Sequence, residues 1–255
     1  MDKEELLLRE SIEISDKTIE KLFYQWLSTL GYDKCLEIYK NYVTLTKEKD
    51  KVSMFSLLQL TQYCYDLSSI LFSLLRQEED YIKAFLCNTF NNYKVRIESR
   101  HSNYVKTKYY FKIPTNLKES EFIDIRTFSY TYGPIEYYDA IKTLDFGDIN
   151  LIMSHLSKSI ISKFSTNPNI IKELDRTRQL RNYVYHHNLL FSMGKDNLLN
   201  DIMMLIKNLP NESSKRYYIS TINALRYKGS NRSEDIGSDI AIFIDSEKEK
   251  DIFNV

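Results

Sequence analysis

The sequence predicts a mainly α-helical (all-α) protein, and two observations support this class. The 255 residues include only 6 glycines and 4 prolines, which argues against a turn-rich β-protein. The chain is also rich in long apolar and charged side chains, which favour helices. At 43% hydrophobic residues it is able to bury a core. Length and composition together favour one main helical domain.

The first clear helix lies in 15–31. Either Ser15 or Asp16 is suited to cap its N-terminus, and Gly31 is suited to end it. Its apolar residues recur at helical spacing and form one face: Ile19, Leu22, Phe23, Trp26 and Leu27. This pattern predicts an amphipathic helix that packs on a core.

Two longer helical segments follow. A second helix is expected over 33–46. The segment 55–93 contains no glycine or proline and suits either one long helix or two stacked helices. Its apolar positions are so dense that we expect burial on more than one side, and nearly all of it is interpreted as core.

The stretch 93–118 is basic and aromatic. Its seven basic residues are Lys94, Arg96, Arg100, Lys106, Lys108, Lys112 and Lys118, interleaved with Tyr93, Tyr104, Tyr109, Tyr110 and Phe111. Alternation in "YVKTKYYFKI" predicts a short strand or β-hairpin near 104–113. Such a stretch could grip a phosphate backbone while its rings stack on bases. It could equally be a solvated edge whose lysines prevent aggregation.

Five further helices are expected towards the C-terminus. The first begins near Ile135, and the second lies in 146–164 with a cap at Asp148. The third runs from about Pro168 to Ser192, and the last two cover 197–209 and 213–228. His155, inside the second of these, is interpreted as packed or surface-exposed rather than catalytic.

The charge of the chain is distributed unevenly. Lys+Arg and Asp+Glu both number 35, so the total charge favours no class of partner. The segment 229–255 carries seven acidic and three basic residues, a net charge of −4, and the rest of the chain is therefore +4. Its apolar island "IAIFI" is expected to dock on the body or on a partner. These features predict an N-terminal helical segment (1–54) packing on a main domain (55–228), followed by an acidic tail (229–255).

Cysteine usage and hydropathy suggest a location in a reducing cytoplasm. The three cysteines, Cys35, Cys64 and Cys87, form no CxxC pair and have no neighbouring histidine, so neither a disulfide framework nor a zinc site is predicted. The N-terminus has acids where a signal peptide has bases. No stretch approaches the roughly 20 apolar residues of a membrane span.

The sequence "LRNYVYHHN", at 180–188, brings together two of the four histidines and an arginine. On a helix that turns about 100° per residue, three side chains of this region fall within about 40° of Leu180. Together the four residues form the stripe expected to face the core: Leu180, Val184, His187 and Phe191. His187 is therefore expected to support the structure or the site.

The remaining polar residues of this helix lie off the stripe. Asn182 and His186 are four residues apart, so the amide could orient the imidazole. Arg181 lies about 140° from His186 but is long enough to lean towards it. Histidine transfers protons near neutral pH, and arginine stabilises negative charge on a phosphorane-like transition state. These residues suit metal-free RNA cleavage, although by composition alone they could also form an ordinary polar helix face.

"RNYVYH" also fits the Arg-Asn-x-x-x-His signature of HEPN domains. The wider run "LDRTRQLRNYVYHHNLLF" resembles Abi-like proteins of the AbiD/AbiF type, an abortive-infection family within the HEPN ribonuclease superfamily. Two other segments, "LLRQEEDYIKAFLCNTFNNY" and "TFSYTYGPIEYYDAIKTL", are similar to segments of that family and occur in the same order. The resemblance covers roughly 55–210.

The resemblance implies a HEPN-type helical bundle that dimerises around a composite cleft and cleaves RNA without metal or cofactor in antiphage defence. It implies that Arg181 is the electrostatic catalyst, that His186 is the general acid or base, and that Asn182 orients it. His187 and Asn188 match the family's extended pattern. The nucleophile would be the ribose 2′-hydroxyl, and one helix would supply half of a site.

Two alternatives remain open beside the nuclease. The chain could hold a structured or guide-like non-coding RNA with little turnover, or its polar helix face could serve only dimerisation. A cognate inhibitor is a further possible partner. The residues expected to bind RNA are Lys94, Arg96, Arg100, Lys106, Lys108, Tyr109, Lys112 and Arg178. The chain contains no Walker A, GxGxxG, HExxH or GxSxG motif.

Overall fold

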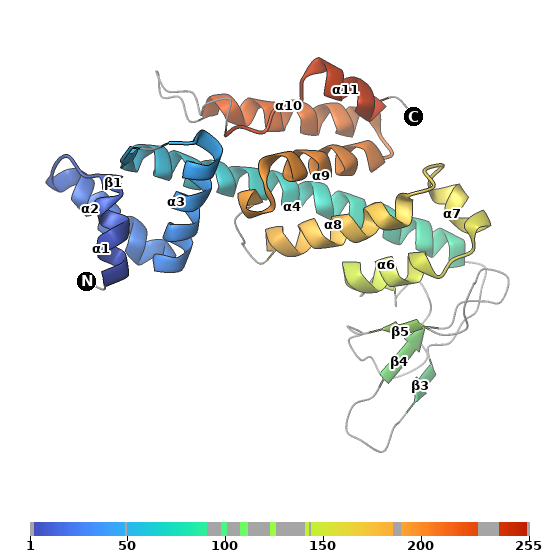
Figure 1. Cartoon of the computed structure of the whole chain (residues 1–255). Helices are drawn as coiled ribbons and strands as arrows, with labels where there is room; N and C mark the ends of the chain where they lie inside the picture. Colours follow the sequence, from blue (N-terminus) through green and yellow to red (C-terminus); the bar gives the residue numbers. More distant parts are fainter. Residues whose placement is uncertain are drawn as a thin grey trace. The chain divides into compact units, whose positions relative to one another are not determined.

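The computed structural model describes residues 3–48, 50–90, 98–100, 108–111, 123–125, 141–142, 144–185, 190–228 and 240–253. It confirms the mainly α class (Figure 1). The helices are α1 (Lys3–Glu10), α2 (Lys17–Leu30), α3 (Tyr32–Thr46), α4 (Met54–Phe90), α6 (Phe146–Ser154), α7 (Lys158–Phe164), α8 (Ile170–Tyr185), α9 (Lys195–Asn208), α10 (Glu212–Lys228) and α11 (Ser246–Phe253), with a 3-10 turn, η1 (Leu190–Met193).

The described strands form two small sheets. β1 (Ile12–Glu13) and β2 (Val52–Ser53) pair in parallel. β4 (Lys108–Phe111) is the centre of an antiparallel sheet with β3 (Glu98–Arg100) and β5 (Ile123–Ile125) at its edges. The strand predicted near 104–113 is present as β4, and both of its partner strands lie outside that range.

The chain divides into two compact units. Unit 1 comprises Met1–Leu74 and Asn182–Val255, and unit 2 comprises Leu75–Arg181. Helices α4 and α8 each run from one unit into the other. The division into an N-terminal segment, a main domain and an acidic tail stays a prediction.

In unit 1, helix α2 forms as its sequence predicts. Of the two possible caps, Asp16 serves, because its carboxylate accepts hydrogen bonds from the backbone N–H of Thr18 at 2.7 Å and Ile19 at 3.0 Å. These bonds hold the pKa of Asp16 below its ordinary value. Gly31 ends the helix at φ 81°, a conformation that glycine adopts without strain. The buried face contains Ile19, Phe23 and Trp26.

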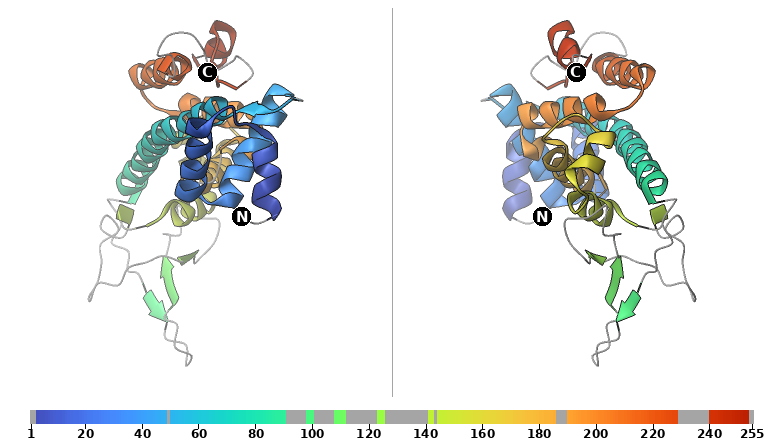
Figure 2. Two further views of the ribbon diagram at one scale, coloured as in Figure 1. Left: turned by 90° about the vertical axis from the view of Figure 1, so that its left-hand side faces the viewer. Right: turned by 90° about the vertical axis from the view of Figure 1, so that its right-hand side faces the viewer.

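The apolar island of the C-terminal segment docks on unit 1 itself. Ile240, Ala241, Ile242 and Ile244 are buried. The backbone N–H of Ile242 donates to the hydroxyl of Tyr63 at 2.7 Å, and Asn223 exchanges two 2.9 Å hydrogen bonds with the backbone of Ile244. Helix α11 follows, and it packs with α10 against α9 (Figure 2). The sequence signalled the island but not this helix.

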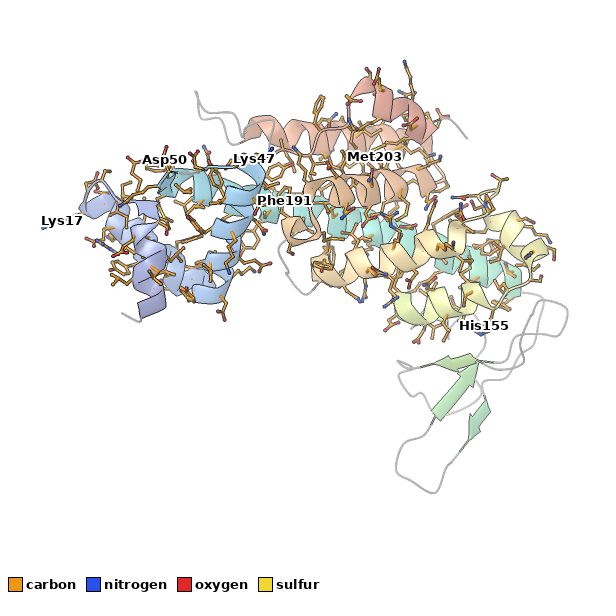
Figure 3. The ribbon with its side chains drawn as sticks, in the orientation of Figure 1. Lys17, Lys47, Asp50, His155, Phe191 and Met203 are labelled. Atoms are coloured by element: carbon orange, nitrogen blue, oxygen red, sulfur yellow. The ribbon has the colours of Figure 1, made fainter. Side chains whose placement is uncertain are left out.

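In unit 2, the C-terminal half of α4 packs with α6, α7 and α8. The core comprises Ile82, Leu86, Phe90, Ile141, Leu144, Phe146, Ile149, Ile152, Met153, Leu156, Ile160, Ile170 and Leu174. The single helix expected over 146–164 with a cap at Asp148 is wrong. Asp145 caps α6, because its carboxylate accepts from the backbone N–H of Asp148 at 2.9 Å, and the helix ends at His155 (Figure 3) before α7 begins.

Helix α8 confirms the first part of the helix predicted from Pro168 to Ser192 but not its end. The segment 190–193 is a 3-10 turn, in which the backbone N–H of Gly194 donates to the carbonyl of Phe191 at 3.0 Å. Leu190 and Phe191 of this turn are both buried. The helices predicted over 33–46, 55–93, 197–209 and 213–228 are confirmed as α3, α4, α9 and α10. The helix expected from Ile135 falls mainly outside the described residues.

Candidate functional site

Helix α8 carries the first part of the candidate site. It begins after an asparagine turn, in which the side chain of Asn167 accepts from the backbone of Asn169 at 2.9 Å and donates to Glu173 at 2.8 Å. Residues spaced three or four apart are buried along its length: Leu174, Thr177, Leu180 and Val184. The stripe predicted from Leu180 and Val184 is therefore confirmed, and it fixes which faces are left for Arg181 and Asn182.

Arg181 and Asn182 occupy the last turns of α8, and both are half-buried. The Nε atom of Arg181 is shielded from solvent. By contrast, the neighbouring Arg176 and Gln179 are exposed. Arg181 is therefore less exposed than these two polar residues of the same helix.

His186, His187 and Asn188 lie outside the described residues, but the residues on either side are described. Tyr185 stacks on Phe72, with ring centroids 4.6 Å apart and planes 27° apart. Phe191 stacks on Tyr63 at 6.1 Å and 20°. Both partners belong to α4, so aromatic contacts hold each end of the segment that carries the two histidines.

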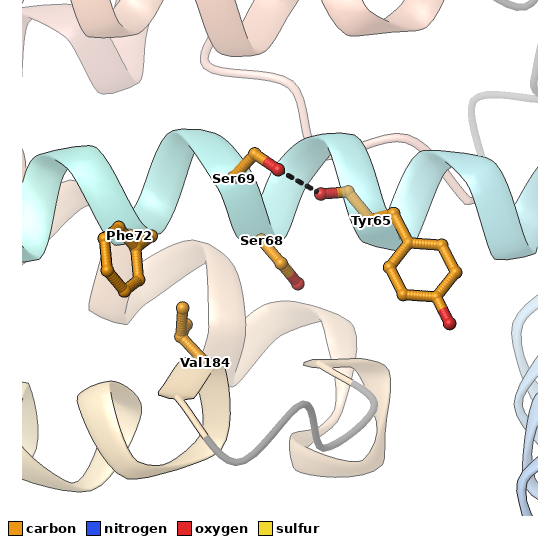
Figure 4. A pocket seen from close by; sticks show the side chains of 5 residues that line it. All are labelled: Tyr65, Ser68, Ser69, Phe72 and Val184. Atoms are coloured by element: carbon orange, nitrogen blue, oxygen red, sulfur yellow. Dashed lines mark hydrogen bonds between the residues drawn. The ribbon is translucent and has the colours of Figure 1, made fainter.

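A hollow of about 300 Å³ lies in unit 1 next to the end of α8 (Figure 4). It is lined by Tyr65, Ser68, Ser69 and Phe72 from α4 and by Val184 from α8. The sequence did not reveal this hollow, because 55–93 was interpreted almost entirely as core. The available signal was the pair of adjacent hydroxyl residues, Ser68 and Ser69.

The predicted RNA-binding residues are only partly described. Lys94, Arg96, Lys106 and Lys112 lie outside the described residues. Arg100 and Lys108 are placed directly opposite each other in the register of β3 and β4, and Tyr109 lies opposite Ser99 and Ile125. Arg178 lies on α8, where its guanidinium bonds the carboxylate of Asp175 at 2.9 and 3.0 Å. The structure thus brings Arg100 and Lys108 together, and Arg178 carries a local ion pair.

The thiols of Cys35 and Cys64 are poor candidates for chemistry. Burial raises the pKa of each to about 12, so both stay protonated near neutral pH. His155 is half-buried, and its Nδ1 lies 2.8 Å from the carbonyl oxygen of Leu151 in its own helix. In the described part of the chain, no three His, Cys, Asp or Glu residues are arranged to hold a metal ion.

Comparison of the chain with models of protein families, with functionally characterised proteins and with solved structures finds no match. None of the helices that the structure describes is long and apolar enough to cross a membrane. The function that we infer from "RNYVYH" is therefore a proposal.

Proposed function

We propose that this chain is a metal-independent HEPN endoribonuclease of antiphage abortive-infection defence, acting in the bacterial cytoplasm. One observation carries the proposal: α8 holds Arg181 and Asn182, both half-buried, in the turns that lead directly to His186 in the sequence. A half-buried guanidinium interacts more strongly with an anion than a solvated one, because less water screens the interaction. Its position supports a role towards a phosphate.

The proposed reaction needs no nucleophile from the protein. His186 removes the proton of the ribose 2′-hydroxyl or protonates the leaving 5′-oxygen, while Arg181 stabilises the charge that develops on the phosphorane. The 2′-oxygen attacks the adjacent phosphorus, the bond to the 5′-oxygen breaks, and a 2′,3′-cyclic phosphate remains. Asn182 precedes His186 by four residues in the sequence and orients its ring. His187 and Asn188 support the segment, and a second copy of the chain completes the site.

The test compares four full-length proteins on labelled RNA: wild type, Arg181→Ala, His186→Ala and the control Arg176→Ala. Arg176 is an exposed arginine of the same helix, so its removal changes the net charge in the same way. We expect His186→Ala to lose about 10²- to 10⁴-fold in rate, the usual contribution of a general acid–base group. Arg181→Ala should lose about 10²- to 10³-fold, the usual contribution of one electrostatic donor, and the control should stay near wild type. Equal rates in Arg181→Ala, His186→Ala and Arg176→Ala would refute the proposal.

A second candidate function is that of a protein that holds a structured RNA and cleaves it little. The register of the β3–β4 pair favours it, because Arg100 and Lys108 are cross-strand neighbours. Like charges directly opposite each other destabilise a pair of strands unless an anion intervenes. An RNA phosphate is such an anion.

This second candidate predicts salt-sensitive RNA binding that survives His186→Ala. Arg100→Gln with Lys108→Gln would weaken binding and lower the slope of log affinity against log salt, because fewer counterions are released. The control is Lys172→Gln with Lys207→Gln, two other basic residues. If both double variants bind alike, the sheet does not hold RNA.

A further inference from the structure

The hollow beside α4 has the composition of a site for a planar ring. We infer that it takes one nucleobase of a single-stranded RNA, and this inference deepens the proposed ribonuclease function and rests on it. Nothing in the motif "RNYVYH" requires such a site, since a ribose and a phosphate suffice for the reaction. A base pocket would add affinity for single-stranded RNA.

Helix α4 presents the four lining residues on one face. Positions 65, 68, 69 and 72 are related by steps of three and four residues, so their side chains are neighbours. Tyr65 and Phe72 stand on either side of Ser68, one turn away in each direction (Figure 4). The hollow therefore has an aromatic ring at each end and a hydroxyl between them.

The two rings are exposed although most large apolar side chains of unit 1 are buried. Tyr65 and Phe72 are each 41% exposed. Phe72 is already stacked on Tyr185, whereas Tyr65 has the ammonium of Lys34 over its ring at 5.7 Å from the centroid. A nucleobase stacks on such rings with little dependence on its identity. Tyr65 is the ring that we assign to stacking.

Two hydroxyls supply the polar contacts that a base needs at its edge. Ser68 is half-buried, and its hydroxyl makes no hydrogen bond with another described residue. It is therefore able to donate one hydrogen bond and accept others. Ser69 donates to the carbonyl of Tyr65 at 2.9 Å, which leaves its lone pairs as acceptors. Every base carries donors or acceptors that such hydroxyls can meet.

The size, charge and location of the hollow favour a nucleotide over a peptide. A volume of about 300 Å³ is at the lower end of ligand sites and suits a single ring system rather than a helix or strand. Lys34 places a positive charge at Tyr65, where the phosphate attached to a stacked base would benefit from it. Val184, which closes the hollow, precedes His186 by two residues. The bound base would thus neighbour the motif along the chain.

The test measures binding in the inactive His186→Ala protein, so that the probe is not consumed. The probe is a fluorescent RNA octanucleotide pool of random sequence, read by anisotropy. Tyr65→Ala should raise the Kd roughly 5- to 150-fold, the range for loss of one base stack, while Tyr65→Phe keeps the ring and should bind like the parent. Tyr217→Ala, which removes another exposed tyrosine of unit 1, is the matched control.

A photocrosslink locates the contact independently. With 5-iodouridine in the octanucleotide, irradiation should join the RNA to the α4 peptide that contains Tyr65, and Tyr65→Ala should abolish that product. If Tyr65→Ala binds as Tyr217→Ala does, or if no crosslink falls in α4, the inference is overturned. Because Tyr65 is exposed, equal melting temperatures of the variants will show that all of them are folded.

Failure of this inference is distinguishable from failure of the proposed function. A wild type that cleaves RNA and a His186→Ala variant that does not, together with no effect of Tyr65→Ala, would overturn the base site alone. A wild type that leaves RNA intact would overturn the proposed nuclease. The binding and crosslinking of the octanucleotide would then still decide whether the hollow holds a base.

Discussion

Tyr63 links three parts of unit 1 through one side chain. Its hydroxyl accepts a 2.7 Å hydrogen bond from the backbone N–H of Ile242, and its ring stacks on Phe191 in the turn that follows the histidine segment. The residue is almost fully buried, and this burial raises the pKa of its hydroxyl. This hydrogen bond stabilises the folded state, because without it the buried N–H of Ile242 would be left unpaired, which costs free energy.

Replacing Tyr63 by phenylalanine tests this contribution. The ring and its stacking remain, but the N–H of Ile242 loses its acceptor, so we expect the free energy of unfolding to fall by about 1–3 kcal/mol. Chemical denaturation measures this free energy of unfolding. The control is Tyr65→Phe on the same helix, whose exposed hydroxyl bonds no described residue and whose removal should change stability little. Equal losses in the two variants would show that the bond to Ile242 adds nothing.

At the level of elements, the C-terminal segment is part of the fold of unit 1. Ile240, Ile242, Ile244 and Ile252 are buried, and the side chain of Asn223 pairs with both backbone groups of Ile244 as a strand would. Helix α11 adds contacts of Arg216 with the ring of Phe253 at 4.7 Å and with Glu249 at 3.8 Å. An acidic side chain of α11 is thus paired with a basic side chain of α10.

Neighbouring residues of the island provide a matched pair of substitutions. Ile242→Ala removes a fully buried side chain and should lower the free energy of unfolding by about 2–5 kcal/mol. Phe243→Ala removes a larger but exposed side chain, and its effect should be well below that. Thermal or denaturant unfolding of the full chain measures both. A larger loss for Phe243→Ala than for Ile242→Ala would contradict the docking of the island.

The helices that the sequence predicts best are those whose ends carry a chemical signal. Asp16 and Gly31 bound α2 as expected because a carboxylate cap and a positive-φ residue are local properties. The cap at Asp145 was missed because Asp145 and Asp148 are both suitable, and burial of Phe146 decides between them. The break at His155 lacks glycine and proline, so only tertiary packing of Leu156 and Ile160 reveals it.

The candidate site was less predictable than the helices. The motif and the buried stripe of α8 follow from periodicity, so Leu180, Val184, Arg181 and Asn182 lie where the spacing puts them. The hollow depends on which side of α4 remains uncovered, and that is decided by residues distant in sequence. Phe72 illustrates this: its apolar side chain predicts burial, yet it is partly exposed.

At the scale of the molecule, the proposed chemistry implies a dimer, since one chain provides a single copy of "RNYVYH". We expect the purified chain to sediment at about twice its mass of 30.3 kDa. His186→Ala should keep that mass, because the substitution removes chemistry rather than the interface. Analytical ultracentrifugation measures the mass of both proteins in solution. A monomer that cleaves RNA at full rate would contradict a composite site.

The most direct measurement of the central claim compares wild type with His186→Ala at equal oligomeric state on labelled total RNA in the presence of EDTA. We expect that wild type alone produces fragments, and that these fragments end in a 2′,3′-cyclic phosphate, because the ribose hydroxyl is the nucleophile and no metal takes part. Intact RNA with both proteins, or equal cleavage by both, would contradict it.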